Sequence, residues 1–510
     1  MTDALKPHYD MLIIGGGING TAIARDAAGR GLSVLLCERD DLANHTSSSS
    51  TKLIHGGLRY LEHFEFRLVH EALKEREVLL KCAPHIIWPM RFVLPYDKGL
   101  RPAWMLRAGL FLYDSLGGRD VLPGTKFVNL RKGVHKSVLE KRLTKGFEYS
   151  DCWVEDARLV VLNAVDAAAR GAQILTRTEV LNLETNDEGY SAEIRLKDGS
   201  VKTISARGIV NSAGPWVDEI LGRLQKGRND AGLRLVKGSH IVTKRLFEGD
   251  HAYIFQNADN RIIFAIPYEG DYTLIGTTDV PFDHAPGLVK ISPEETEYLC
   301  EAANEYFEND ITPEDVLWSY SGVRPLYDDK SADASAVTRD YVLDIDEFVD
   351  DAPFLSIYGG KITTSRKLAE HAMQKLSPFF FKKGKSNAGK LSGGQKDWTR
   401  TAQFPGGDIV KADFETFFAK CQERYPDVPR ANLLRLARSY GTRISMIVGG
   451  TGALGQMFGA GLSEAEARYL AQYEWATRAE DVMWRRTKLG LHMSEAEREI
   501  FTVWFADVVG

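Results

Sequence analysis

The fold is decided close to the N-terminus by residues 10–38, which read DMLIIGGGINGTAIARDAAGRGLSVLLCE. A short apolar run, Asp10 to Ile14, meets a turn of glycines, and Thr21 to Gly31 follows with alanines and isoleucine at helical spacing. A second apolar run, Ser33 to Cys37, ends in the acid Glu38. This order predicts strand, glycine turn, helix and strand, which together form one βαβ unit of the usual size.

The glycines of the turn, Gly15, Gly17 and Gly20, have the spacing G-x-G-x-x-G. The first permits a tight turn, the second lets a pyrophosphate approach the backbone, and the third lets helix and strand pack closely. The helix N-terminus offers N–H groups to phosphates, and Glu38 stands where a carboxylate accepts a hydrogen bond from a ribose hydroxyl. The unit therefore predicts a Rossmann-type dinucleotide site, and by itself it leaves NAD and FAD both open.

Later segments favour FAD, because a flavin dinucleotide runs deep enough into its protein to meet chain that returns to the first sheet. Ile209 to Trp216 and Gly359 to Thr364 have the character of such returns. The small hydroxyls of Thr46 to Ser50 are candidates for hydrogen bonds to the pyrophosphate, although a solvated loop has the same composition.

The composition excludes several classes of protein. The chain has 510 residues, 44% hydrophobic and 26% charged, with a formal net charge of -6, so two or three globular domains are expected. Mild acidity argues against general nucleic-acid binding. The five cysteines are odd in number, far apart and without a C-x-x-C pair, so neither a metal site nor a disulfide framework is expected. Cysteine usage and the polar N-terminus predict a reducing, cytoplasmic environment.

The pattern changes along the chain and predicts several domains. Strands alternate with turns between Leu233 and Asp279, which predicts an antiparallel sheet inserted into the first domain. Helical periodicity dominates after a Lys-, Gly- and Ser-rich linker at Pro378 to Lys396. We expect a discontinuous FAD domain (8–83, 150–232 and 318–380), an aromatic and basic segment (84–149), a substrate-binding cap (233–317) and a helical C-terminal domain (397–510).

Several further blocks carry a resemblance to a known family. They read HGGLRYLE at 55–62, KGSH at 237–240, SGVRPL at 321–326, TRDY at 338–341 and GGK at 359–361. With the glycine turn, and over nearly the whole chain, they resemble the aerobic, FAD-dependent glycerol-3-phosphate dehydrogenases of bacteria. The resemblance implies a D-amino-acid-oxidase-like α/β fold, FAD, and oxidation of sn-glycerol 3-phosphate to dihydroxyacetone phosphate with electrons passed to a membrane quinone. It also implies a homodimer, peripheral to the cytoplasmic face of the inner membrane.

The substrate of that family is a phosphate dianion, so its site needs cations held in fixed directions. We assign Arg324 and Arg339 to the phosphate, with the hydroxyl of Tyr60 beside them, and Arg59 and Lys361 to the flavin and the reacting carbinol. Each cation alone is more often a surface ion pair, and its place inside a matching block is what favours the site.

Oxidation of a secondary alcohol needs a base for the hydroxyl proton, and a histidine near neutrality suits that task. His55 and His240 are both candidates for the base, and the sequence does not choose between them. Beyond the glycine turn and Glu38, we expect cofactor contacts from Thr46, Ser47, Ser48, Ser49, Lys52, Leu53, His55, Gly57, Val180, Gly214, Gly360, Lys361 and Thr363.

The segment from Trp88 to Tyr113 holds six aromatic and four basic residues against one acid, Asp97. Aromatic rings at the headgroup level and cations for anionic lipid are typical of an interfacial segment, and a buried helix or a dimer contact is the alternative. Rival functions are a glycerol-3-phosphate oxidase, an amino-acid or amine oxidase, and a non-catalytic flavin-bound membrane adaptor.

Overall fold

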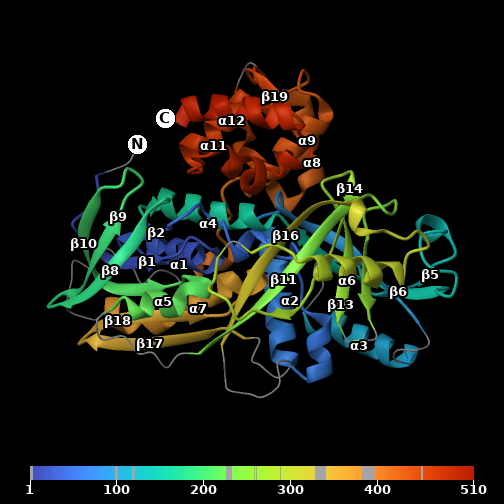
Figure 1. The fold of residues 1–510 in the computed structure, drawn as a ribbon, viewed down its shortest axis with the longest axis horizontal. Coiled ribbons are helices and arrows are strands. Elements are labelled where there is room, and N and C mark those ends of the chain that lie inside the picture. Colours follow the sequence, from blue (N-terminus) through green and yellow to red (C-terminus); the bar gives the residue numbers. More distant parts are fainter. Residues whose placement is uncertain are drawn as a thin grey trace.

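The computed structural model describes residues 4–97, 102–117, 121–224, 232–257, 259, 261–287, 289–327, 340–381, 397–449 and 452–509. For Arg59, Glu62 and His63 it describes the backbone and not the side chain. In this part of the chain two large sheets stand side by side, and a helical domain lies against both (Figure 1).

The first sheet has eight strands, and its main path runs β17-β18-β10-β1-β2-β7. The pairs of β1 with β2 and β10, of β10 with β18, and of β2 with β7 are all parallel, which confirms the predicted βαβ unit and both returns of the chain. Helices α1 (Ile18–Gly29), α4 (Asp156–Ala169) and α7 (Ser365–Phe380) share one core with the sheet. The strands are β1 His8–Ile14, β2 Val34–Cys37, β7 Gln173–Leu175, β8 Glu179–Asn186, β9 Gly189–Arg195, β10 Val201–Asn211, β17 Val342–Val349 and β18 Ala352–Tyr358.

The second sheet has ten strands in the order β15-β11-β14-β13-β12-β4-β6-β3, with β16 on β11 and β5 on β6. The antiparallel sheet expected between Leu233 and Asp279 is present as β11, β12, β13 and β14, and α6 (Pro293–Asn304) contacts three of these strands. The strands are β3 Leu53–Ile54, β4 Ile87–Pro95, β5 Lys126–Asn129, β6 Lys145–Val154, β11 Leu233–Lys244, β12 Ala252–Gln256, β13 Ile262–Tyr268, β14 Tyr272–Gly276, β15 Val280–Pro281 and β16 Val316–Tyr327.

This second sheet draws on more of the chain than the predicted cap at 233–317. β4 and the first half of β6 belong to the aromatic and basic segment at 84–149, and most of β16 belongs to the segment predicted for the FAD domain. The physical reason is burial: pairing of β4 with β6 and β12 places Phe92, Val93 and Leu94 in the core.

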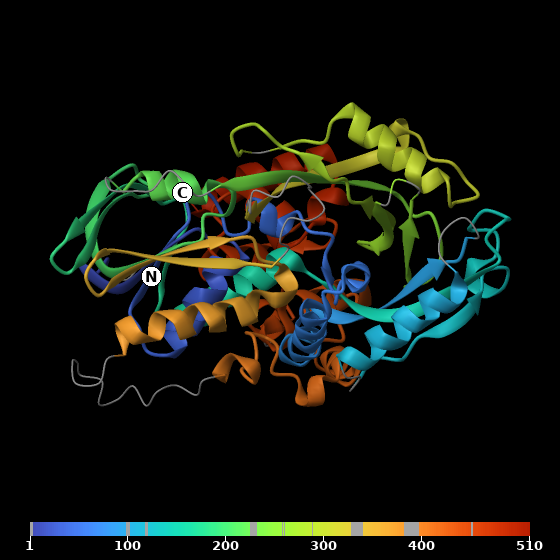
Figure 2. The same ribbon diagram turned by 90° about the horizontal axis from the view of Figure 1, so that it is seen from below.

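Within the aromatic segment from Trp88 to Tyr113, the strongly exposed rings lie on helix α3 (Ala103–Leu116). Of its residues, Leu110 and Tyr113 are buried, whereas Trp104 and Phe111 are 71% and 73% exposed. Figure 2 shows α3, in light blue, at the edge of the second sheet that faces away from the first. Among the described residues, no helix is both long and apolar enough to cross a membrane.

The C-terminal residues form a helical domain with its own core. The segment that leads into it is fastened to the first sheet's helices, because the Trp398 indole donates to the Asp26 carboxylate (2.7 Å) and lies on Gly29, where a Cβ would come within 2.1 Å of the ring. The described residues between Ile444 and Ser463 form a short helix and a hairpin. The elements are α8 Phe414–Arg424, α9 Arg430–Tyr440, α10 Ser445–Val448, β19 Met457–Gly459, β20 Leu462–Ser463, α11 Glu464–Tyr473, η10 Asp481–Arg486 and α12 Glu495–Val509.

Candidate active site

A cleft opens at the carboxyl ends of the central strands β1, β2 and β10, where open α/β sheets bind ligands. It encloses about 1000 Å³, its open mouth included. Several predicted cofactor residues line it, namely Gly15, Gly17, Glu38, Thr46, Ser47, Val180, Gly214 and Gly360.

The glycine turn has the close packing that the motif predicts. Gly15 has φ +111°, a conformation that favours glycine, and a Cβ there would lie 2.6 Å from the carbonyl oxygen of Ser212. Gly20 does not line the cleft; a Cβ on it would lie 2.0 Å from the carbonyl oxygen of Gly15. The third glycine therefore acts through helix packing, as its motif position implies.

Glu38 closes one end of the cleft. Its carboxylate accepts the N–H groups of Gly16 (2.6 Å) and Asp40 (2.8 Å). Burial raises the pKa of Glu38, and the two N–H groups oppose that rise. A carboxylate has about four acceptor positions, so Glu38 can hold the turn and also receive a ribose hydroxyl.

The loop after β2 carries the hydroxyls of residues 46–49 and is called the hydroxyl loop below. Thr46 and Ser47 line the cleft, and Ser48 and Ser49 do not. Ser47 Oγ accepts the N–H of Ile18 at the start of α1 (3.0 Å), and Thr46 donates to the carbonyl of Val323 (2.6 Å). Ser48 and Ser49 do not line the cleft and donate to the carbonyl of His45. Ser47 is thus placed beside the helix N-terminus that would receive a pyrophosphate, and Thr46 lines the same cleft.

Asn19 is a cleft residue that the sequence reasoning missed. Its Nδ2 donates to the carbonyl of Gly359 (3.1 Å), while its buried Oδ1 has no hydrogen-bond partner among the described residues. The signal was present, since Asn19 stands inside the glycine motif on the first turn of α1. An orphaned acceptor in a cleft with a glycine turn and a terminal acid fits a bound dinucleotide.

Two further predicted cofactor residues lie behind the loop. The Lys52 ammonium is buried and contacts both carboxylate oxygens of Asp156 (2.9 and 3.0 Å) and the carbonyl of Ser48 (3.1 Å). Leu53 is buried and pairs with Trp153 of β6. In this structure Lys52 fixes the path of the hydroxyl loop instead of lining the cleft.

A first group of catalytic candidates surrounds His55. The Nδ1 atom of His55 accepts the N–H of Gly57 (3.1 Å), and the backbone N–H of His55 donates to the Thr363 hydroxyl (3.3 Å). The Lys361 ammonium lies 4.1 Å from the centre of the Tyr60 ring. Burial lowers the pKa of His55 below 6.5, with Asp151 opposing and Lys361 and Arg76 adding to the fall. Because Nδ1 accepts a hydrogen bond, neutral His55 carries its proton on Nε2.

A second group is built on His240 of β11. His240 pairs with Gly276 on one side and Tyr320 on the other, stacks on the Tyr320 ring (4.7 Å), and contacts the Thr51 hydroxyl through Nε2 (3.0 Å). Its buried Nδ1 has no partner in the described part of the chain. Burial, helped by the charges of Lys52 and Arg324, holds the pKa of His240 well below 6.5, so the ring is neutral at pH 7.

The group around His55 and the group around His240 are linked through strands β13 and β14 of the second sheet. Gly276 also pairs with Phe264, and the Phe264 ring lies 6.5 Å from the ring of His55. Arg324 donates to Asp279 (2.9 Å) and to the Thr277 hydroxyl (3.2 Å), on the strand next to His240. Arg339 lies outside the described residues, and of Arg59 the structure describes the backbone alone.

The dinucleotide cleft, the terminal acid and the flanking antiparallel sheet define a FAD-binding oxidoreductase. Residues 10–345 match the family described as "FAD dependent oxidoreductase", and residues 398–504 match "C-terminal domain of alpha-glycerophosphate oxidase". The chain is 52% identical to D-erythritol 1-phosphate dehydrogenase of Brucella abortus (97% of each chain). It is 50% identical to glycerol-3-phosphate dehydrogenase of Pseudomonas aeruginosa (96% and 93%) and 47% to aerobic glycerol-3-phosphate dehydrogenase of Escherichia coli (98% and 97%).

A solved structure agrees with these relatives. The glycerol-3-phosphate dehydrogenase of Bacillus halodurans, complexed with FAD, superposes with a TM-score of 0.72 at 25% identity, covering 100% of this chain and 95% of that one. The chain belongs to the family of FAD-dependent glycerol-3-phosphate dehydrogenases, and the predictions of D-amino-acid-oxidase-like fold and FAD cofactor are confirmed.

Proposed function

We propose that the protein oxidises sn-glycerol 3-phosphate to dihydroxyacetone phosphate by hydride transfer from C2 to the flavin N5, and passes the electrons to a membrane quinone. The observation that carries the proposal is the Nδ1 of His240, which is buried and has no hydrogen-bond partner among the described residues, on the strand that pairs with the one carrying Arg324. Relatives at 50% and 47% identity are glycerol-3-phosphate dehydrogenases, which supports the same substrate here.

Bound FAD supplies the hydride acceptor, and the protein's own task is to take the hydroxyl proton and hold the phosphate. His240 suits the proton transfer, because its ring is neutral at pH 7 and Nδ1 can accept. Neutral His55 instead presents an N–H at Nε2 and suits donation of a hydrogen bond. We therefore assign the base to His240 and a binding role to His55.

The cations divide between two tasks in this proposal. Arg324 is 38% exposed at its side chain, and its partners Asp279 and Thr277 hold it on the cap strands, where a guanidinium can bind phosphate. Lys361 lies at the start of the loop that opens α7, near His55 and Tyr60, where its charge would stabilise negative charge that develops on the substrate oxygen. Arg59 and Arg339 keep the roles that the resemblance implies.

Helix α3 supports the membrane part of the proposal. Trp104 and Phe111 are exposed beside Met105 and Arg107, and the nearby residues Phe64 and Phe127 are also exposed. Apolar rings with a neighbouring guanidinium are the composition of a surface that inserts into the headgroup region. We place this surface on the cytoplasmic face of the inner membrane, where a quinone is within reach, and propose a homodimer, to be tested by sedimentation in detergent.

A second substrate has its own support. The relative at 52% identity is a D-erythritol 1-phosphate dehydrogenase, so a four-carbon polyol phosphate is the alternative for the same site and the same chemistry. Both substrates present a secondary hydroxyl and a phosphate, and they differ in one carbinol unit.

An anaerobic titration of the detergent-purified protein tests the proposal. We expect sn-glycerol 3-phosphate to bleach the oxidised flavin band and a ubiquinone analogue to restore it. Faster bleaching by D-erythritol 1-phosphate, compared as kcat/KM, would reassign the substrate. Turnover with oxygen and release of hydrogen peroxide without quinone would identify an oxidase, and a flavin that neither phosphate reduces would favour a non-catalytic adaptor.

A further inference from the structure

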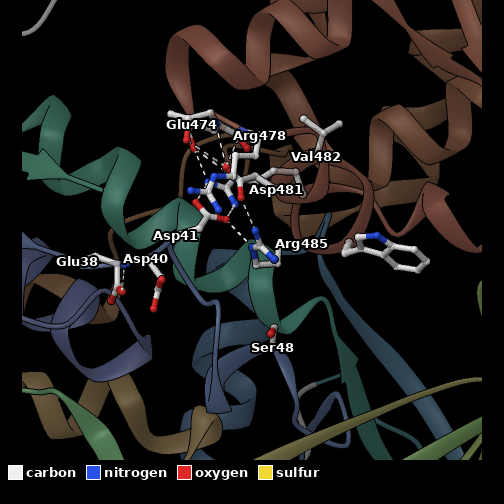
Figure 3. A network of polar contacts seen from close by, with 12 residues as sticks. Glu38, Asp40, Asp41, Ser48, Glu474, Arg478, Asp481, Val482 and Arg485 are labelled. Atoms are coloured by element: carbon white, nitrogen blue, oxygen red, sulfur yellow. Dashed lines mark hydrogen bonds and ion pairs between the residues drawn. The ribbon is translucent and has the colours of Figure 1, made fainter. Parts of the chain in front are cut away.

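The C-terminal domain reaches the FAD cleft through a short helical segment, η10 (Asp481–Arg486). Asp41, three residues after Glu38, is buried, and its carboxylate accepts hydrogen bonds from Arg485 Nε (2.5 Å) and from both terminal nitrogens of Arg486 (2.7 and 2.8 Å). Figure 3 shows Arg485 and Asp41 in contact above the loop that carries Glu38 and Asp40. Two guanidinium groups of the C-terminal domain thus bind one carboxylate of the loop that carries Glu38 and Asp41, called the cofactor loop below.

The same segment holds a second loop of the cleft. Arg177, which follows β7, donates from Nη2 to the Asp481 carboxylate (2.7 Å). Its backbone N–H donates to the carbonyl of Asp40 (2.9 Å), and the next N–H, of Thr178, donates to the carbonyl of Glu38 (2.8 Å). Thr178, Glu179 and Val180 then line the cleft. The two loops that enclose the Glu38 end are therefore tied to each other and both to η10.

The segment η10 is also held by hydrogen bonds to residues 474–478 of its own domain. Asp481 accepts the N–H groups of Thr477 (2.9 Å) and Arg478 (3.0 Å), and Arg486 donates to the carbonyl of Glu474 (2.7 Å). Arg158 of α4, in the FAD domain, donates to the buried Glu474 carboxylate (3.0 Å). These bonds set the position of η10 relative to the first sheet as well as within its own domain.

Both tied loops contain a backbone conformation that needs external support. Ala43 has φ +61° and Arg177 has φ +55°, the left-handed region that residues other than glycine adopt at a cost. Such conformations persist where the surroundings hold them. Here Asp41, two residues before Ala43, and Arg177 itself are the residues that η10 contacts.

We propose that η10 is a clamp for FAD: the Asp41–Arg485–Arg486 and Arg177–Asp481 contacts preorganise the cleft end that receives the adenosine half of the cofactor. Preorganisation strengthens binding by removing the cost of ordering the loops when the ligand arrives. The C-terminal domain then acts on cofactor affinity and not on the hydride transfer, and Asp41 and Arg177 are positioning residues.

The first test measures FAD affinity by the fluorescence of released flavin. Arg485→Met removes one of the three bonds to Asp41 and keeps the bidentate Arg486 pair, so this variant should fold. We expect its dissociation constant for FAD to rise about tenfold and its kcat to return to the parent value with excess FAD, with an unchanged KM. Arg177→Met, on the second loop, should behave in the same way.

Arg468→Met is the matched control, because Arg468 makes an exposed ion pair with Glu464 on the same domain. It should leave the FAD dissociation constant within twofold of the parent. An unchanged dissociation constant in both Arg485→Met and Arg177→Met, or lost turnover that excess FAD does not restore, would overturn the proposal.

The second test uses the parent protein and thermodynamic reciprocity. If η10 favours FAD binding, FAD binding must by the same free energy oppose opening of η10. We expect hydrogen exchange of peptides spanning Glu474–Lys488 to be slower in the FAD-loaded protein than in the apoprotein, while Phe414–Arg424 in the same domain exchanges alike in both. Equal exchange of Glu474–Lys488 in the two forms would refute the clamp.

Discussion

His240 stacks on Tyr320 and contacts Thr51 through Nε2, while its Nδ1, the proposed base, has no hydrogen-bond partner among the described residues. Replacement of His240 by Asn should lower kcat about 100- to 10,000-fold, the range for loss of a general base, while FAD content and KM stay close to the parent. Since burial holds the pKa of His240 well below 6.5, kcat/KM in the parent should fall on the acid side only below pH 6.5. Steady-state kinetics against pH measure both effects.

Replacement of His55 by Asn tests whether His240, and not His55, is the base. His55→Asn keeps a side chain that can hydrogen-bond but changes its geometry, so a smaller loss is expected, mainly in KM. A large fall in kcat for His55→Asn with normal turnover in His240→Asn would exchange the two roles.

Lys52 illustrates a buried charge whose function is structural. It is 1% exposed and its partner Asp156 is fully buried, so Lys52→Met leaves a carboxylate without its cation. Breaking such a pair costs about 3–5 kcal/mol, and we expect a loss of this size in the free energy of unfolding measured by urea denaturation. Arg468→Met, which breaks an exposed pair, should cost less than about 1 kcal/mol; equal losses would contradict the interpretation.

Residues whose roles depend on neighbours in the sequence could be predicted, and those that depend on distant partners could not. Gly15, Gly17 and Glu38 are fixed by local spacing around one turn, and all three line the cleft. The ion pair of Lys52 with Asp156 joins residues that are 104 positions apart, and nothing in the sequence around Lys52 distinguishes an ammonium bound to a carboxylate from one that faces a cofactor.

At the level of elements, the periodicity of the sequence predicts whether a segment is a helix or a strand, but it does not predict which strands pair with each other. Stretches of strand character separated by turns predicted an antiparallel sheet between Leu233 and Asp279, and β11 to β14 form it. The predicted domain bounds did not include β4 and β16 in the cap, because strand pairing is long-range: β4 pairs with β12, some 160 residues later. The aromatic content of β4 reflects core burial and resembles that of an interfacial segment.

Helix α3 is the element whose surface can be tested most directly. Trp104→Ser and Phe111→Ser should each weaken binding to vesicles of anionic phospholipid about tenfold or more, because each ring contributes roughly 1.5–3 kcal/mol when it leaves water. Both side chains are more than two thirds exposed, so the thermal midpoint should stay unchanged. Co-sedimentation with vesicles measures the binding.

Val503→Ser on α12 is the control for nonspecific apolar contact, since Val503 is 64% exposed on a different domain. Vesicle binding that Val503→Ser weakens as much as Trp104→Ser does would argue against α3 as the membrane surface. Loss of dimer formation in Trp104→Ser, with vesicle binding intact, would assign α3 to the subunit interface instead.

The C-terminal domain contacts both the second sheet and a helix that packs on the first sheet. Trp484 stacks on Trp318 of β16 (5.2 Å), the hydroxyl of Tyr272 donates to the carbonyl of Leu491 (3.1 Å), and Arg158 of α4 donates to the carbonyl of Ser439 (2.9 Å). A helical domain could be predicted from the sequence, but its function could not, because these contacts join side chains that no local motif connects. Its place between the cofactor loops and the cap follows from the structure.

His85, just before β4, lies buried against the C-terminal domain, close to Gly406 and Gly441, and we expect it to make this junction sensitive to acid. Neither ring nitrogen has a hydrogen-bond partner among the described residues, and burial, with Arg158 and Arg438 nearby, lowers its pKa from 6.5 to about 3. The unfolded chain therefore binds a proton below pH 6.5 that the folded chain does not, and stability is lost as the pH falls from 6.5 toward 3.

Between pH 7 and pH 5 this single histidine should remove about 2 kcal/mol of stability, since each pH unit below 6.5 is worth about 1.4 kcal/mol. In His85→Leu the free energy of unfolding, measured by urea denaturation at both pH values, should depend on pH less steeply by that amount. If His85→Leu and the parent lose equal stability over this range, other groups set the acid sensitivity of the junction.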